Sequence, residues 1–274
     1  MNTPSYFAEQ SDEFVGPFKS WANVKTVFGA KGNGVDDDSA AFQKALDSIN
    51  QPGASHVIWI PSGKYVITQP LYGWMKGGFS IIGEDPDTTS IIWEGDAGAT
   101  MLTMNASAYF TISRLTFNGR GVAGVAEDIT TFSGGTGGYY STFNELSDQH
   151  IVGVQNGIQL SVDAETAIQR IFFDKIPGNA LSMGTFNTLN IFIDDSLFLE
   201  SGTGVTNIPD QAGQFIVSNC FFARSSVADM SIYNTGYFTA RHNTSVGSRQ
   251  FWNSLNVGSN TAVVTLQNLS LIHI

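Results

Sequence analysis

The chain has 274 residues with a formal net charge of −11, and 42% of them are hydrophobic, which is enough to bury a sizeable core in a single domain. Its 29 glycines against 8 prolines favour many short strands joined by tight turns over long helices. The negative charge argues against a nucleic-acid or anionic-membrane partner, because phosphate groups are bound by lysine and arginine.

The two ends of the sequence bear on location and completeness. The first residues lack the charged and apolar segments of a signal peptide, so the protein is either cytoplasmic or virion-borne, or its export signal lies upstream of Met1. We favour an extracellular or virion-associated protein. Residues 269–274 match the translation of a transposase adapter from sequencing libraries, and we interpret them as a non-native tail. The natural sequence would then stop near Asn268, although a last apolar strand is the alternative interpretation.

Residues 24–50 follow an N-terminal extension, residues 1–23, and predict a strand, a glycine-rich loop and a helix. Glycines in the loop allow positive φ, and Asp38 or Ser39 can cap the first amides of the helix. The helix carries an apolar stripe at helical spacing, made of Phe42, Ala45, Leu46 and Ile49.

Residues beyond Phe110 repeat. Six windows align, beginning at Ile112, Leu146, Ile168, Ile193, Val217 and Ala240. The last five begin 22 to 25 residues apart, which is the length of a solenoid coil. The first step, of 34 residues, is too long, so we expect a loop insertion at residues 119–142, with a glycine run at 134–138, that either binds a ligand or decorates the surface.

Three segments carry a family resemblance: residues 28–38 with the helix after them, residues 60–67, and residues 81–91. They closely resemble the opening of pectate-lyase-superfamily β-helices, especially bacterial proteins related to family 28 glycoside hydrolases. The resemblance implies an all-β, right-handed parallel β-helix solenoid over residues 24–268, with the helix capping its N-terminal end. If residues 269–274 come from an adapter, the solenoid is truncated at its C-terminus. It also implies a polysaccharide partner.

A second short strand follows each window, and in characterised relatives this strand often lines the substrate groove. Strict alternation predicts that Ile158, Leu160, Met230 and Ile232 point inward. The same alternation points the intervening residues outward, namely Gln159, Thr206, Asp229, Ser231 and Tyr233.

The windows also align charged residues, because equal positions in adjacent coils are neighbours. The third window position reads Arg114, Asp148, Arg170, Asp195, Asn219 and His242. We interpret it as an ion-pair ladder at a bend, leaning inward and including an Arg170–Asp195 pair, with part of it a catalytic acid and base as the alternative. A second column, Lys175, Glu200 and Arg224, is either an exposed salt-bridge stack or a site for sugar carboxylates.

The candidate catalytic residues are the carboxylates Asp195, Asp229 and Glu165, because glycoside hydrolysis needs two carboxylates and polysaccharide lyases need a base. The candidate substrate-binding residues are Lys175, Arg224, Tyr233, Arg249 and Trp252. The polygalacturonase and pectate-lyase motifs are missing, so the resemblance assigns no catalytic residue. The four histidines lack metal-ligand spacing, and we expect no metal or cofactor, except Ca²⁺ for a lyase.

These observations predict a carbohydrate-active enzyme, a hydrolase before a lyase, that cleaves an acidic or pectin-like polysaccharide and is monomeric. One alternative is a phage tailspike or surface glycan-binding β-helix, which would be a homotrimer. The other alternative is a structural solenoid without catalysis.

Overall fold

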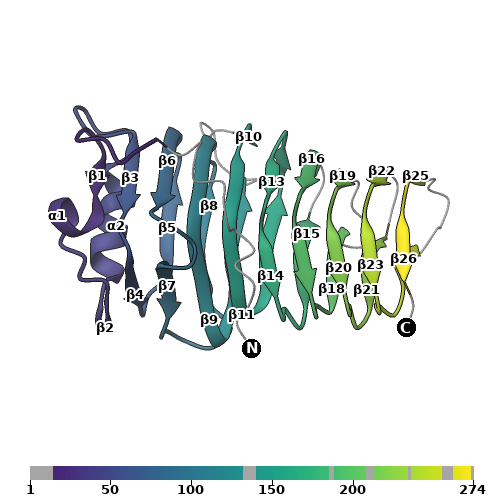
Figure 1. The fold of residues 1–274 in the computed structure, drawn as a ribbon. Helices are drawn as coiled ribbons and strands as arrows, with labels where there is room; N and C mark the ends of the chain where they lie inside the picture. The colour runs from purple at the N-terminus through teal and green to yellow at the C-terminus, as the bar shows by residue number, and fades with distance from the viewer. Residues whose placement is uncertain are drawn as a thin grey trace.

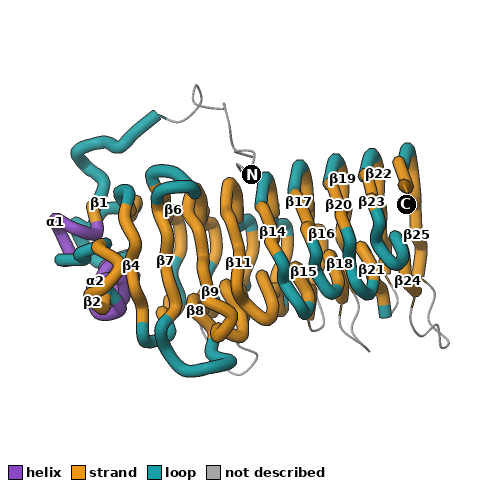
Figure 2. Tube along the Cα trace, turned by 60° about the horizontal axis from the view of Figure 1, so that its bottom comes forward, coloured by secondary structure: helices purple, strands orange, loops and turns teal. Residues whose placement is uncertain are grey.

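The computed structural model describes residues 15–131, 140–184, 188–207, 213–233, 236–254 and 262–272. Within them the chain winds into a solenoid whose strands pair in parallel from coil to coil (Figure 1). Helices α1 (Val24–Phe28) and α2 (Ser39–Ser48) lie at one end of the stack, and strands β24 (Trp252–Ser254) and β25 (Ala262–Gln267) lie at the other (Figure 2). The predicted all-β, right-handed parallel β-helix is confirmed.

Each complete coil contributes one strand to each of three parallel sheets. Two long strands, β9 (Ala108–Thr130) and β11 (Glu145–Ser161), bend twice and run through all three. Sheet I also contains β1 (Ala22–Asn23), β3 (Val57–Ile60), β6 (Gly77–Gly83), β13 (Ala167–Gln169), β16 (Thr188–Asp194), β19 (Gly213–Ser218), β22 (Gly236–Arg241) and β25 (Ala262–Gln267).

Sheets II and III follow in each coil. Sheet II contains β2 (Asn33–Asp37), β4 (Gly63–Ile67), β7 (Thr89–Trp93), β14 (Phe172–Asp174), β17 (Leu197–Leu199), β20 (Phe221–Ala223), β23 (Thr244–Val246) and β26 (Ser270–Ile272). Sheet III contains β5 (Leu71–Trp74), β8 (Thr100–Asn105), β15 (Asn179–Gly184), β18 (Thr203–Asn207), β21 (Ala228–Ile232) and β24 (Trp252–Ser254). Two short strands, β10 (Ser141–Thr142) and β12 (Asp163–Ala164), pair between sheets III and I.

The predicted register of the six windows is confirmed. Leu146 pairs with both Ile112 and Ile168, and the pairing continues through the first residue of each later window to Ala240. These first residues are all fully buried. The rings of Phe173, Phe198 and Phe222 stack inside with centroids 4.8 and 4.6 Å apart, so equal positions in successive coils build the core.

Each corner of the coil holds a column of residues with positive φ. Corner 1, between sheets I and II, contains Arg114, Asp148, Arg170, Asp195, Asn219 and His242, with φ from 48 to 62°. Corner 2, between sheets II and III, contains Gly153, Lys175, Glu200, Arg224 and Gly247. Corner 3, between sheets III and I, contains Gly78, Tyr109, Phe143, Glu165 and Asn190. Both charged columns predicted from the sequence are therefore corner residues.

The N-terminal segment differs from the prediction. Residues 24–28 form the helix α1 instead of a strand, because Asn23 Oδ1 accepts hydrogen bonds from Lys25 N and Thr26 N, and Gly29 ends the turn with φ of 87°. Asp38 does not cap α2. Its carboxylate accepts from Lys31 N and Gly32 N and so closes the glycine-rich loop.

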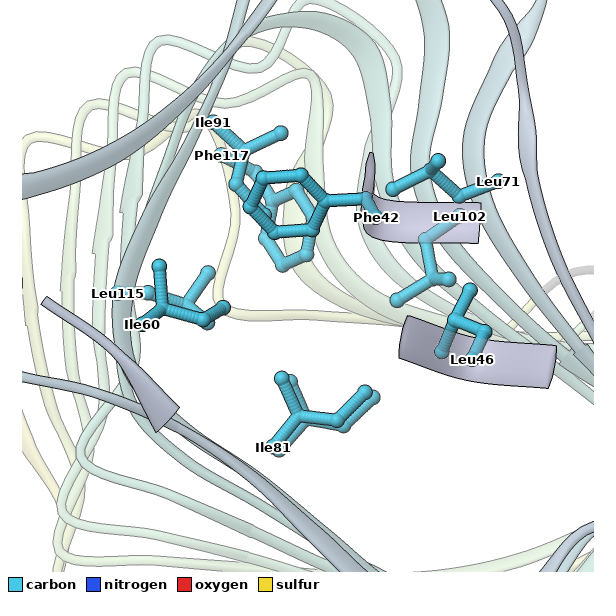
Figure 3. A pocket seen from close by; sticks show the side chains of 10 residues that line it. Phe42, Leu46, Ile60, Leu71, Ile81, Ile91, Leu102, Leu115 and Phe117 are labelled. Atoms are coloured by element: carbon cyan, nitrogen blue, oxygen red, sulfur yellow. The ribbon is translucent and has the colours of Figure 1, made fainter. Parts of the chain in front are cut away.

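Helix α2 presents its predicted apolar stripe to the solenoid interior. Phe42 and Leu46 face Ile60, Leu71 and other apolar side chains of the first coils across a cavity of about 20 Å³ (Figure 3). That volume could hold one water molecule, but the lining offers no polar partner, so we expect the cavity to be dry.

The predicted insertion at 119–142 is wrong for residues 123–130. Residues 123–130 complete β9 in sheet III, where Leu102 and Ile158 flank Glu127 on the two neighbouring strands. Residues 119–122 pass corner 2, where the next coil has Gly153 alone, so three extra residues lie there and the rest of the extra length follows Thr130. The glycine run at 134–138 lies outside the described residues.

Candidate functional site

The three predicted catalytic carboxylates lie at different places around the coil. Asp195 is exposed at corner 1, Asp229 is in sheet III just beyond corner 2, and Glu165 is at corner 3. These three positions lie on different sides of the solenoid, so no two of the carboxylates can act together on one glycosidic bond. Each must be judged by its own surroundings.

Asp229 points into the solenoid, contrary to the prediction from alternation. Alternation fails here because Asp229 N and Met230 N both donate to the next coil, to Gln250 O and Phe251 O, whereas successive residues of a regular strand face opposite neighbours. The Asp229 side chain is fully buried, and its Oδ2 accepts from Ser245 Oγ. Asp229 is thus an interior residue that the solvent does not reach.

The ion pair at corner 1 differs from the prediction as well. Arg170 Nε and Nη2 donate to Asp148 Oδ1 and Oδ2 at 2.7 and 2.9 Å, a two-pronged pair, and Asp195 is not its partner. The column lies at a bend, as predicted, but its side chains are half-buried or exposed and do not lean into the core. Burial raises the pKa of Asp195, with Asp194 adding to the effect and Arg170 opposing it.

The five predicted substrate-binding residues do not form one cluster. Lys175 and Arg224 lie at corner 2, where Arg224 pairs with Glu200 at 2.6 Å and Lys175 Nζ lies 3.9 Å from Asp174 Oδ1. Arg249 lies just before β24, Trp252 is the first residue of β24, and Tyr233 directly follows β21. Their roles in binding stay predictions.

A row of exposed side chains marks corner 3. Tyr109 and Phe143 are 57% and 58% exposed, and their rings stack with centroids 5.5 Å apart and 12° between the planes. Glu165 is the next residue of the column, because Thr142 pairs with Ala164 one position earlier. We call these three residues the ridge. It combines an open aromatic surface with a carboxylate.

Several polar groups support Glu165. Thr142 Oγ1 donates to Glu165 Oε2 at 2.6 Å, which holds the carboxylate beside Phe143. Beneath it, Asn144 Nδ2 donates to the fully buried Asp163 Oδ1 at 3.0 Å. Burial raises the pKa of Asp163 to about 6, with the Glu165 charge contributing and hydrogen bonds opposing. Burial, Asp163 and Glu165 together raise the pKa of Tyr140. Two carboxyl groups therefore lie together at this corner, each held by hydrogen bonds from neighbouring polar side chains.

The sequence contained a signal for the ridge that the prediction of the site missed. Tyr109, Phe143 and Glu165 each precede the first residue of a window by three positions, so counting backwards from the windows would have aligned them. Aromatic residues at that position give no hint of positive φ, which usually signals glycine or asparagine. Glu165 was predicted alone, without its aromatic neighbours.

Two expected absences concern metals and membranes. The described residues contain no group of three or more histidine, cysteine, aspartate or glutamate side chains that could hold a metal ion. Among the same residues, no helix has both the length and the apolar character needed to cross a bilayer.

A known protein matches a short stretch of this chain. A curated glucan 1,3-beta-glucosidase of Cochliobolus carbonum is 38% identical over 63 residues, which cover 20% of this chain and 8% of that protein. The chain thus matches only a small part of that relative's length.

Solved structures share the fold at low identity. The phiAB6 tailspike, solved in complex with oligosaccharides of Acinetobacter baumannii surface polysaccharide, has a TM-score of 0.63 and 16% identity, covering 91% of this chain and 47% of the tailspike. The catalytic domain of a family GH87 alpha-1,3-glucanase in complex with nigerose has a TM-score of 0.59 and 12% identity, covering 94% and 46%.

A family model assigns the chain as a whole. The model described as "Rhamnogalacturonase A/epimerase, pectate lyase-like" matches residues 21–260. The chain therefore belongs to this family of pectate lyase-like β-helices.

Proposed function

We propose that this chain is the β-helix of a carbohydrate-active protein that binds a polysaccharide along corner 3 and hydrolyses it there. The observation that carries the proposal is the ridge, where the exposed stack of Tyr109 and Phe143 adjoins the Glu165 carboxylate. Aromatic side chains offer a large apolar surface at low entropic cost, which suits the apolar faces of sugar rings. The relatives with glucanase and tailspike functions support a glycan ligand.

Glu165 is the carboxylate assigned to act on the glycosidic bond. Hydrolysis needs a second carboxyl group to give or take a proton. Asp163 lies two residues before Glu165, and its pKa of about 6 favours the acid form below that pH. Because Asp163 is fully buried, it positions the groups beneath Glu165 and transfers no proton to the substrate. The second carboxyl group is therefore unassigned. A lyase would need a cation beside the base, and the charges that act on Asp163 and Tyr140 are carboxylates, so we favour hydrolysis. Ca²⁺ belongs to the lyase alternative.

The test is an incubation with a panel of polysaccharides, measuring new reducing ends and, separately, the absorbance of unsaturated products. We expect reducing ends without unsaturated products, and we expect Glu165→Gln to abolish them. Asp195→Asn is the matched control, because Asp195 is exposed at another corner. Unsaturated products would identify a lyase, and activity retained by Glu165→Gln would remove Glu165 from the proposal.

The second candidate is a glycan-binding β-helix of the tailspike kind that does not cleave. The complete burial of Asp163 favours it, because only one carboxylate of the ridge, Glu165, is open to a ligand. Such a protein would be a homotrimer, whereas we expect the hydrolase to be a monomer. Light scattering after size-exclusion chromatography separates the two, and a stable trimer that binds glycan without releasing reducing ends would establish the second candidate.

A further inference from the structure

The ridge has an open slot at its N-terminal end. Phe143 covers one face of the Tyr109 ring, and the other face is directed toward the preceding coil, where Gly78 occupies the equivalent position. Among the described residues, a Cβ atom built on Gly78 would meet no atom within 4 Å, and His56 Nδ1 lies 3.1 Å from Gly78 O. No side chain at the equivalent position of the preceding coil therefore covers this face of the exposed Tyr109 ring.

The charges around the slot select what can enter it. The segments that join sheet III to sheet I from residue 75 onward are 75–78, 106–109, 131–144, 162–166, 185–190, 208–214, 233–237 and 255–263. Of the chain's 13 lysines and arginines, only Lys76 occurs in them. Its Nζ donates to Asp47 O and Ile49 O at 3.3 and 3.0 Å, so it is engaged with the end of α2.

Carboxylates, by contrast, are present at this corner. Glu165 and Asp163 lie in the described part, and burial together with their charges raises the pKa of Tyr140. A polymer with a carboxylate on each sugar would bring like charges together without a counter-charge from the protein, which costs binding energy. The arginines that could bind sugar carboxylates lie at other places, for example Arg170 at corner 1 and Arg224 at corner 2, and both are paired with acids.

We propose that the ridge binds an uncharged polysaccharide, with one sugar ring packed on Tyr109 over Gly78 and the chain running past Phe143 to Glu165. This inference rests on the proposed function and names the substrate class of the same site. It replaces the acidic or pectin-like polymer expected from the family resemblance. The direction of the chain follows from the column, since its members stack along the solenoid axis at the spacing of adjacent strands.

The experiment measures binding of the full chain to three kinds of polymer by affinity electrophoresis and calorimetry. Laminarin, dextran and galactomannan are the uncharged polymers, polygalacturonate and alginate the anionic ones, and chitosan the cationic one. Tyr109→Ala removes the aromatic face, and Gly78→Asn fills the slot with a residue that tolerates positive φ. Tyr109→Phe keeps the ring, and Phe221→Ala removes a 38% exposed aromatic from sheet II as a matched control.

We expect at least one uncharged polymer to bind more tightly than any charged one, with little dependence on salt. Tyr109→Ala and Gly78→Asn should each weaken that binding roughly three- to tenfold. Phe221→Ala should bind like the wild type, and Tyr109→Phe should recover most of the binding that Tyr109→Ala loses. Thermal melts of all four variants check the fold, and Gly78→Asn keeps the test decisive if Tyr109→Ala is unstable.

Each contrary result tests a different proposal. Tighter binding of polygalacturonate, alginate or chitosan would overturn the uncharged class and leave the proposed function standing. Binding of an uncharged polymer that neither variant weakens would place the site elsewhere. No binding of any polymer would overturn both proposals, and self-association that Tyr109→Ala abolishes would then identify a second copy of the chain as the partner of the ridge.

Discussion

Glu127 places a carboxyl group in the apolar interior, where Leu102 and Ile158 are its neighbours in adjacent coils. The side chain is fully buried, and burial raises its pKa to about 8, with the Gln149 side chain opposing the shift. Both carboxyl oxygens of Glu127 are buried without a hydrogen-bond partner among the described residues, so nothing there offsets the cost of burying a charge. Glu127 is therefore buried in its neutral form.

The consequence is a fold that loses stability as pH rises. The pKa of Glu127 is 4.5 in the unfolded chain and about 8 in the folded one, so between these values the folded state binds more protons. Stability contributed by this group is fully present below pH 4.5 and is lost as pH rises through 8. From about pH 5 to about pH 7 the loss should be roughly 2 to 3 kcal/mol, or a fall in Tm of roughly 5 to 10 °C.

The assay is a set of thermal melts of wild type and Glu127→Gln across this pH range. The glutamine is isosteric and cannot ionise, so the difference in Tm between the two proteins should change with pH in favour of the variant. Asp96→Asn, at an exposed carboxylate, is the control and should follow the wild type. A wild type and Glu127→Gln that respond to pH in parallel would refute the buried neutral acid.

Three further predictions concern the scaffold and are read from thermal melts. Phe198→Ala removes the middle ring of the interior stack and should cost about 3 to 5 kcal/mol; a loss below about 1 kcal/mol would contradict the packing described. Asp148→Asn breaks the paired hydrogen bonds of Arg170 and should cost about 1 kcal/mol, whereas Asp195→Asn should change stability by less than about 0.5 kcal/mol; equal losses would return Asp195 to the ion pair. Residues 270–272 form strand β26, paired with β23 as in the alternative interpretation of the sequence, but its side chains are exposed. Deleting residues 269–274 should therefore cost about 1 kcal/mol or less, and a loss of several kcal/mol would refute their interpretation as a non-native tail.

The register of the solenoid could be predicted from the sequence because it depends on a repeating side-chain pattern. Window residues such as Ile112 and Ala240 are apolar at a near-constant spacing, and the same burial requirement applies in every coil. The long step between the first two windows gave a wrong prediction. It assigned residues 119–130 to a loop, whereas they continue strand β9. Glu127 was missed for the same reason.

The site could be predicted only in part, because it depends on backbone geometry that residue types do not reveal. The corners hold charged and aromatic residues at positive φ, where glycine or asparagine is the usual signal. Strict alternation directed Asp229 outward, but two successive amides bond to the same neighbouring coil and turn it inward. The sequence identified Glu165 as a candidate catalytic residue. Its neighbours Tyr109 and Phe143 could be recognised only by aligning the coils at corner 3.

The most direct test of the central claim is a crystal structure of the full chain with an uncharged oligosaccharide from the polymer that binds most tightly. We expect a sugar ring packed on Tyr109 above Gly78, the following sugars beside Phe143, and the Glu165 carboxylate within hydrogen-bond reach of a glycosidic oxygen. An oligosaccharide bound instead along the outer face of sheet III at Gln159, or at corner 2 beside Lys175, would contradict it.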